Sequence, residues 1–144
     1  MQVLILGATS AIAAEVAQIY AQQGARLHLV GRDPAKLARV AALCTGATVT
    51  TQQADFGELD ANEGIVRAAL RSLGQVDVVL IAHGELGDQL ASERSFDDAE
   101  ATLRINFTSV VSLLIPIANE LEAARTGRIA VITSVAGDRG RPRN

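Results

Sequence analysis

Apolar residues occur along the chain in short runs that alternate with segments of helical periodicity. The first run, residues 3–6, ends at Gly7, and a second run, residues 27–30, ends at Gly31. Between them, apolar residues recur on one helical face: Ile12, Val16, Ile19 and Tyr20. The stretch 1–33 therefore predicts a strand, a tight turn, a helix and a second strand, which together form a βαβ unit.

The same alternation continues to the end of the chain. Further helices are predicted at 35–43, 60–73 and 95–121, the last with a break near 101–104, and further strands at 47–53, 76–82 and 128–133. Loops are predicted at 85–94 and 136–144. The half-helix 105–121 contains Pro116 amid Val, Leu and Ile, so we expect a buried or interface helix there.

Strands that alternate with helices predict a parallel sheet in an α/β fold. We expect one domain, residues 1–144, with a Rossmann-like, doubly wound, three-layer architecture that ends after its fifth strand. Right-handed crossovers place strand 1 centrally and give the order 3-2-1-4-5. In such sheets ligands bind at the carboxyl ends of the strands where the order reverses, so Gly7 and residues 82–84 mark the expected site.

Composition narrows the classes of partner. A net charge of −3 gives no basic field for nucleic acid. A single cysteine, Cys44, excludes an internal disulfide, and two histidines give little support for a metal site. No uncharged apolar run approaches the ~20 residues of a membrane span. We therefore expect a cytoplasmic protein without a nucleic-acid, membrane or metal partner.

The turn after the first strand combines small residues with a helix N-terminus, where backbone N–H groups can face a phosphate. Ala11 and Ala13 stand where a dinucleotide-binding turn usually has its later glycines. Two interpretations remain: a phosphate-binding turn, or a βα turn whose small residues allow close packing. The candidate cofactor-binding residues of this turn are Gly7, Thr9, Ser10 and Ile12.

Arg32 follows the second predicted strand, where NAD-dependent enzymes usually have a carboxylate for the ribose hydroxyls. A guanidinium can instead pair with a 2′-phosphate through two hydrogen bonds. NADP is thus the expected cofactor and NAD the less favoured one. The alternative is that Arg32 is an ordinary surface arginine.

Several segments occur in the order found in the short-chain dehydrogenase/reductase family, which the chain resembles over essentially its whole length. They are LILGATSAIAAEVA, LVGRDPAKL, Ala54-Asp55-Phe56, Ala82-His83-Gly84, RINFTSVV and RIAVITSVAG. The resemblance implies that Asp55 and Phe56 flank the adenine, and that Ala82 and Gly84 line the cofactor groove. It also implies catalytic roles for Asn106 and Ser134. The chain departs from the family in the alanines of the turn and in having IAHG where NNAG is more usual.

The residues themselves leave these roles open. Ser134 follows the fifth predicted strand on the ligand side, where its hydroxyl could donate to a substrate carbonyl or serve as a polar turn residue. Asn106 lies among apolar neighbours, where its amide could hold a water, satisfy helix backbone or be purely structural. We expect His83 to be a packed or loop histidine and not a proton-transfer group.

Members of the family also use a Tyr-x-x-x-Lys pair, which this chain lacks. Its one tyrosine, Tyr20, has Gly24 at the matching offset, and its one lysine, Lys36, belongs to another predicted helix. The resemblance therefore implies the N-terminal portion of a longer reductase, inactive as this chain.

For the whole protein, the resemblance implies hydride transfer between a nicotinamide cofactor, NADP by preference, and a small carbonyl or alcohol substrate. It also implies a homo-oligomer, either a dimer or a tetramer. The alternative is a non-catalytic nucleotide-binding module that acts as a sensor or scaffold.

Overall fold

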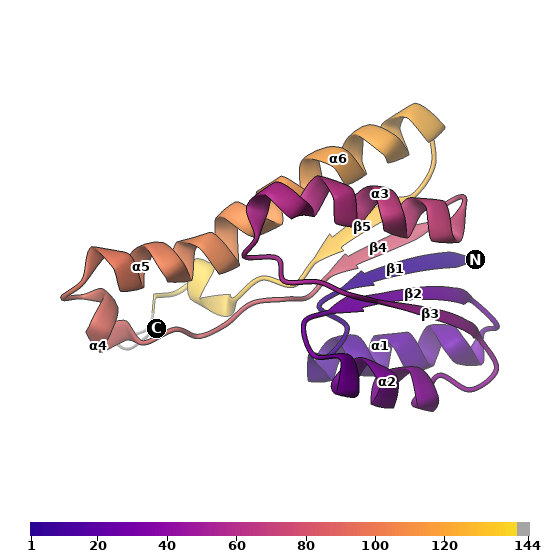
Figure 1. The fold of residues 1–144 in the computed structure, drawn as a ribbon, viewed down its shortest axis with the longest axis horizontal. Helices are drawn as coiled ribbons and strands as arrows, with labels where there is room; N and C mark the ends of the chain where they lie inside the picture. Colours follow the sequence, from indigo (N-terminus) through magenta and orange to yellow (C-terminus); the bar gives the residue numbers. More distant parts are fainter. Residues whose placement is uncertain (141–144) are drawn as a thin grey trace.

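The computed structural model describes residues 1–140, in which strands and helices alternate as predicted (Figure 1). Part of the predicted loop 136–144, from residue 141 onward, lies outside the described residues. The strands are β1 (Gln2–Leu6), β2 (Arg26–Gly31), β3 (Thr48–Gln53), β4 (Val78–Ile81) and β5 (Arg128–Val131). The α-helices are α1 (Ala11–Gln22), α2 (Pro34–Leu43), α3 (Asn62–Leu73), α4 (Gln89–Ser92), α5 (Phe96–Leu103) and α6 (Ser109–Ala124).

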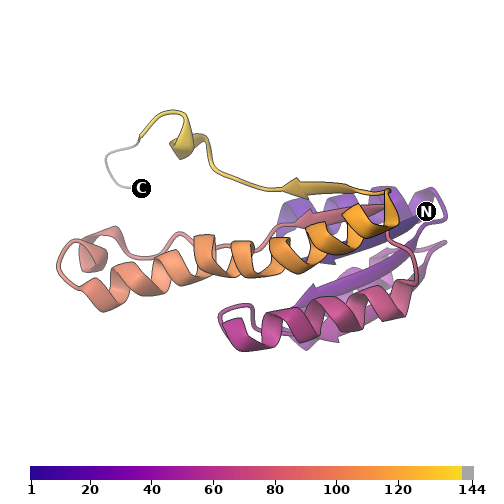
Figure 2. The same cartoon turned by 90° about the horizontal axis from the view of Figure 1, so that it is seen from above.

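The five strands form one parallel sheet in the order β3-β2-β1-β4-β5, which confirms the predicted topology. In the centre of the sheet, Val3 of β1 pairs with Leu27 of β2 on one side and with Val78 of β4 on the other. Helices α1 and α2 cover one face, and α3 and α6 cover the opposite face (Figures 1 and 2). The fold is therefore the expected three-layer, doubly wound arrangement.

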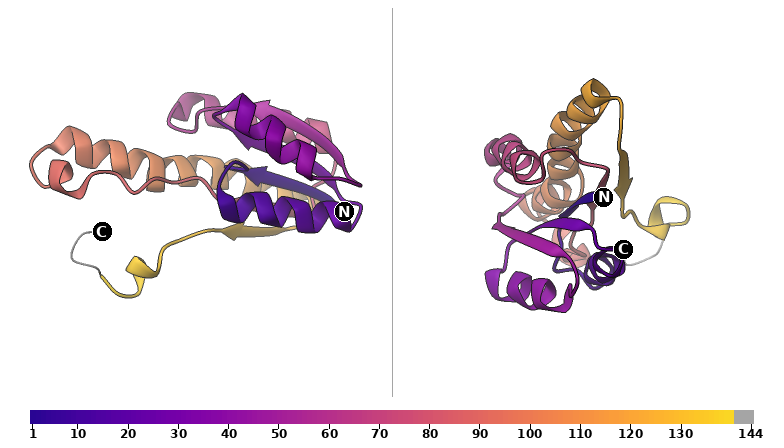
Figure 3. Two further views of the ribbon diagram at one scale, coloured as in Figure 1. Left: turned by 90° about the horizontal axis from the view of Figure 1, so that it is seen from below. Right: turned by 90° about the vertical axis from the view of Figure 1, so that its right-hand side faces the viewer.

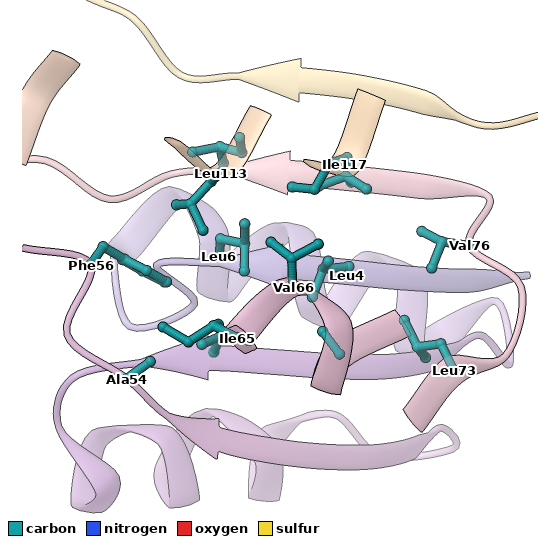
Figure 4. Packing of buried hydrophobic residues seen from close by; sticks show 14 of the residues in the cluster. Leu4, Leu6, Ala54, Phe56, Ile65, Val66, Leu73, Val76, Leu113 and Ile117 are labelled. Carbon is teal, nitrogen blue, oxygen red and sulfur yellow. The ribbon is translucent and has the colours of Figure 1, made fainter. Parts of the chain in front are cut away.

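Beneath α3 and α6 lies an apolar cluster built on β1. Val66 of α3 and Leu113 and Ile117 of α6 are fully buried against Leu4 and Leu6 of the central strand (Figure 4). The apolar residues of α3 recur on one face of this amphipathic helix, and this face is the one that is buried. Burial of this cluster fixes both helices against the sheet.

Helix α1 packs against the sheet mainly through its alanines. Ala13, Ala17 and Ala21 are buried at 0–1% exposure, whereas Ile12 and Ile19 are 59% and 53% exposed. Methyl side chains let the helix axis approach the sheet closely, because the larger residues of β1 and β2 already fill the space between the layers. Of the apolar residues predicted on one face of α1, Val16 and Tyr20 pack partly buried against the cluster that contains these alanines, whereas Ile12 and Ile19 do not.

The predicted helix 95–121 is interrupted by one turn of π-helix, η2 (Arg104–Thr108), between α5 and α6. The predicted break near 101–104 thus lies next to the observed irregularity. The short helix α4 occupies part of the predicted loop 85–94, because the Asp88 carboxylate accepts a hydrogen bond from the Ala91 amide at 3.1 Å and caps it.

Within residues 1–140, one helical stretch, Phe96–Ala124, is long and apolar enough to cross a membrane by these two criteria alone. Its inner face, which includes Leu113 and Ile117, belongs to the core, whereas its outer face exposes Phe107 and Ile115. The segment 105–121 was expected to be a buried or interface helix. One of its faces is buried, and the opposite face is exposed but also apolar.

At the end of β1 the chain turns against the loop that follows β4. Gly7 has a φ of +83°, and a Cβ atom at this position would lie 2.4 Å from the backbone nitrogen of His83. Because both the backbone conformation and the space exclude a side chain, only glycine fits here.

We predict that Gly7→Ala lowers the free energy of unfolding by about 2 kcal/mol or more, since it adds left-handed strain to a backbone clash. Urea denaturation followed by circular dichroism measures the change. The matched control is Gly64→Ala in α3, where an added Cβ has no neighbour within 4 Å. It should stabilise the protein by up to about 1 kcal/mol. Equal effects of the two substitutions would contradict the packing at Gly7.

Candidate functional site

A cleft of ≈ 240 Å³ opens at the carboxyl ends of the central strands. Most of the cofactor-binding residues predicted from the sequence line it: Gly7, Thr9, Ser10, Arg32, Asp55, Phe56, Ala82 and Gly84. The exposed side chain of Ile12 is not part of the lining, and neither are Asn106 and Ser134. The cleft thus lies where a doubly wound sheet is expected to bind its ligand.

One wall of the cleft is the turn that leads from β1 into α1. The amides of Gly7 and Ala8 both donate to the Val30 carbonyl, at 2.9 and 3.0 Å, which fixes the turn on β2. Ser10 caps the helix, with its Oγ accepting from the Ala13 amide at 3.2 Å. The first amides of a helix have no partner within it, and they carry its positive dipole end. This wall can therefore hold an anion.

A second wall, at the end of β2, combines two cations with one carboxylate. Arg32 and Lys36 line the cleft, and neither takes part in the two ion pairs found among residues 1–140. The Asp33 carboxylate instead caps α2, accepting from the amides of Ala35 and Lys36 at 2.9 and 3.0 Å. The hydrogen bond from the Lys36 amide is the main cause that lowers the pKa of Asp33.

The sequence reasoning missed Lys36 as a residue of this wall. It stands four residues after Arg32. The early helix start at Asp33-Pro34 was the available signal, because it places Lys36 in the first turn of α2, near the strand end.

The loops after β3 and β4 form the remaining wall. The rings of Phe56 and His83 lie against each other, with centroids 4.5 Å apart and planes inclined by 39°. The carboxylate of Asp55 accepts from the Gly57 amide at 2.9 Å, which holds the β3 loop in a tight turn. Both Asp55 and Phe56 thus reach the cleft from a loop with fixed geometry.

His83 is packed into this wall. Its Nε2 lies 2.7 Å from the hydroxyl of Ser109, and burial lowers the pKa of its imidazole from 6.5 to about 4. The ring is therefore uncharged near neutral pH, where it holds no proton that it could readily exchange with a ligand.

Asn106 and Ser134 both make hydrogen bonds to backbone groups. The Asn106 amide fastens the β4 loop, because its Oδ1 accepts from the Glu85 amide at 2.9 Å and its Nδ2 donates to the Glu85 carbonyl at 2.8 Å. The Ser134 hydroxyl accepts from the Ala136 amide at 3.1 Å and caps a short 3₁₀ turn. This turn follows β5, where the chain runs out beyond the sheet (Figures 2 and 3). The structure therefore does not bring these two side chains together at the cleft.

No group of three or more histidine, cysteine or acidic side chains that could hold a metal ion occurs within residues 1–140.

The model of the short chain dehydrogenase family matches residues 1–144. The chain belongs to the short-chain dehydrogenase family. Among curated members, an uncharacterized oxidoreductase of Mycobacterium tuberculosis (strain ATCC 25618 / H37Rv) is 33% identical over 145 residues, covering 99% of this chain and 58% of that protein. This short-chain dehydrogenase chain therefore spans less than two thirds of the length of that relative.

Solved structures share the arrangement of this short-chain dehydrogenase. An actinorhodin polyketide ketoreductase variant crystallised with NADPH superposes with a TM-score of 0.89 at 25% identity, over 99% of this chain and 56% of that one. An NAD⁺-bound xylitol dehydrogenase superposes with a TM-score of 0.90 at 24% identity, over 99% and 56%. The similarity to the xylitol dehydrogenase is a similarity of fold.

We predict that His83 makes the stability of this short-chain dehydrogenase fall as pH falls from about 6.5 to about 4. Burial lowers the pKa of the folded imidazole below its unfolded value, so protons bind more strongly to the unfolded chain in this window. The loss is about 3 kcal/mol or less. It is measured as the difference in pH dependence of urea unfolding between the wild type and His83→Gln, in which all carboxylates are retained. Identical pH profiles would contradict the burial of this ring.

Proposed function

We propose that the chain forms the cofactor-binding part of an NADP-preferring oxidoreductase. In the whole protein, hydride passes between the nicotinamide cofactor and a small carbonyl or alcohol substrate. The observation that carries this proposal is the cleft itself, which has a helix N-terminus on one side and the cations Arg32 and Lys36 on the other. Family membership supports the class of chemistry.

The residues present fit a dinucleotide. Gly7 leaves the backbone of the turn without a side chain. A Cβ at Gly31 would lie 3.3 Å from the side chains of both Thr9 and Leu37, so glycine at this position keeps the cleft open where these segments approach one another. We assign the diphosphate to the turn from Gly7 through Ser10 to Ile12. Ile12 would contribute its backbone amide to the diphosphate, since its side chain does not line the cleft. The nicotinamide, when bound, supplies or accepts the hydride.

The preference for NADP follows from the charges at the end of β2. Arg32 and Lys36 can both pair with a 2′-phosphate, whereas the Asp33 carboxylate, which could accept from a ribose hydroxyl, already accepts from two amides of α2. Relatives of this fold were crystallised with NADPH and with NAD⁺, so the fold alone does not decide between them.

The remaining assignments complete the proposal. Asp55 and Phe56 flank the adenine, and Ala82 and Gly84 line the groove toward the nicotinamide. For the whole protein we assign Ser134 to the substrate oxygen, and Asn106 to the support of the active-site loop through Glu85. We also propose that the whole protein is a cytoplasmic homo-oligomer.

A non-catalytic nucleotide-binding module is the second candidate. The observation that favours it is that the side chains of Asn106 and Ser134 already make hydrogen bonds to backbone groups and do not themselves line the cleft. Such a module would bind the same nucleotide but would transfer no hydride.

We predict that the chain binds NADPH more tightly than NADH. Arg32→Ala should weaken NADPH binding about tenfold or more, because it removes charge-assisted hydrogen bonds to the 2′-phosphate, and should leave NADH binding nearly unchanged. Titration of cofactor fluorescence measures both constants, since the chain has no tryptophan to interfere. Arg39→Ala is the control, because Arg39 is exposed on α2 outside the cleft lining. Tighter binding of NADH by the wild type would refute the NADP preference.

We also predict that the 144-residue chain turns over carbonyl substrates with NADPH at a negligible rate, because the family's tyrosine acid/base has no counterpart in it. Absorbance of NADPH in the presence of a panel of ketones and aldehydes measures the rate. A steady decrease that depends on enzyme concentration would contradict this prediction.

A further inference from the structure

We propose that His83 is a positioning residue that shapes the cleft wall formed by the loops after β3 and β4, because it fastens three separate segments to one another. These segments are the β3 loop, which carries Phe56, the β4 loop, which carries His83 itself, and the π turn η2. The inference rests on the proposed function for its ligand, but the geometry that carries it is independent of that function.

The first fastening is a hydrogen bond with a defined direction. The hydroxyl of Ser109 donates to the Ile105 carbonyl at 2.7 Å, so its single proton is used there. The His83 Nε2, which lies 2.7 Å from the same oxygen, must therefore be the donor. This fixes the Nε2–H tautomer of His83 and ties the β4 loop to the π turn through a fully buried serine.

The second fastening is the contact between the two rings. Phe56 is 6% exposed and belongs both to the core cluster beneath α3 and α6 and to the lining of the cleft (Figure 4). The ring of His83 lies against it at 4.5 Å. The Phe56–His83 pair thus separates the cleft from the apolar core, and removal of the imidazole would leave Phe56 without support on the β4 side.

The third element is the π turn, which meets both loops. The side chain of Ile105 lines the cleft, and its Cδ1 would lie 3.0 Å from a Cβ added at Gly57 in the β3 loop. The next residue, Asn106, holds the Glu85 backbone from both sides. The β4 loop is therefore fastened to the π turn twice, by His83 and at Glu85.

The uncharged state of the ring suits this role. Its Nδ1 is buried and has no hydrogen-bond partner among the described residues, so a second proton there would be an unpaired buried charge. His83 consequently offers one donor in one direction throughout the neutral pH range, which a residue that titrates near pH 7 would not do.

The test compares variants that remove the hydrogen bond to Ser109, the ring contact with Phe56, or both. His83→Phe keeps a ring against Phe56 without a donor for Ser109, His83→Gln keeps a side-chain N–H donor without the ring, and His83→Ala removes both. The alanine variant should bind NADPH about 2-fold to 10-fold more weakly, because this change in affinity corresponds to the interaction free energy of one aromatic pair. The other two should fall between it and the wild type. Adenosine 2′,5′-bisphosphate, titrated in parallel, reports the loss at the Phe56 end of the cleft.

His28→Ala is the matched control. His28 is a second buried histidine, 5% exposed, but it bonds to Thr50 and Gln52 between β2 and β3 and does not line the cleft. It should bind NADPH as the wild type does at temperatures where both are folded. Equal weakening by His28→Ala would overturn the proposal, since it would trace the effect to general destabilisation.

NMR tests the positioning without any nucleotide. The ¹⁵N spectrum of the wild type should contain an Nε2–H tautomer of His83 that stays unchanged from pH 6 to 8, and Ser109→Ala should abolish that preference. The side-chain amide signals of Asn106 should shift in His83→Ala. Unchanged signals there, or a His83 that titrates near pH 6.5, would overturn the proposal. A wild type that shows these signals but binds no NADPH would instead refute the proposed function.

Discussion

The close approach of two backbone segments at Gly7 is the constraint on which the site depends. Strand β1 ends where the loop after β4 passes, and the space between these two segments is too small for a Cβ atom at Gly7. Because the chain can turn there without a side chain, Gly7 and Ala8 share one carbonyl of β2, and α1 begins directly over the carboxyl edge of the sheet. The bare turn, the helix N-terminus and the β4 loop are therefore placed together by one steric requirement.

The order and type of the elements could be predicted because each has a local cause in the sequence. Continuous apolar runs indicate β1 and β4, which are buried on both faces, and Asp33 followed by Pro34 indicates the start of α2. The buried face of α1 could not be predicted in this way, because closeness of packing favours its alanines over its isoleucines. The π turn at Arg104–Thr108 was located only to within a few residues, since a single inserted residue leaves no compositional trace.

At the candidate site, the sequence identified residues directly after strand ends, such as Arg32 and Asp55, because parallel strands deliver those positions to one edge. Contacts between segments that are distant in the sequence were not predicted, even where the residue itself was expected to be packed. His83 meets Phe56 and Ser109, which lie 27 residues before it and 26 after it along the chain, and no spacing rule connects them. The sequence indicates Asp33 as the cap of α2, and its two hydrogen bonds to α2 amides show that its carboxylate is engaged there, beside Arg32 in the cleft.

The all-parallel sheet also has a kinetic consequence. No strand can pair with its sequence neighbour through a short hairpin, because a crossover separates every pair. The centre of the sheet is the extreme case: the Gln2 amide bonds to the Asp77 carboxylate 75 positions away, at the point where β1 meets β4. Loops of this length must close before the strands can be buried, so the chain is expected to fold slowly for its size. Strand β1 becomes paired on both sides only once β4 is in place.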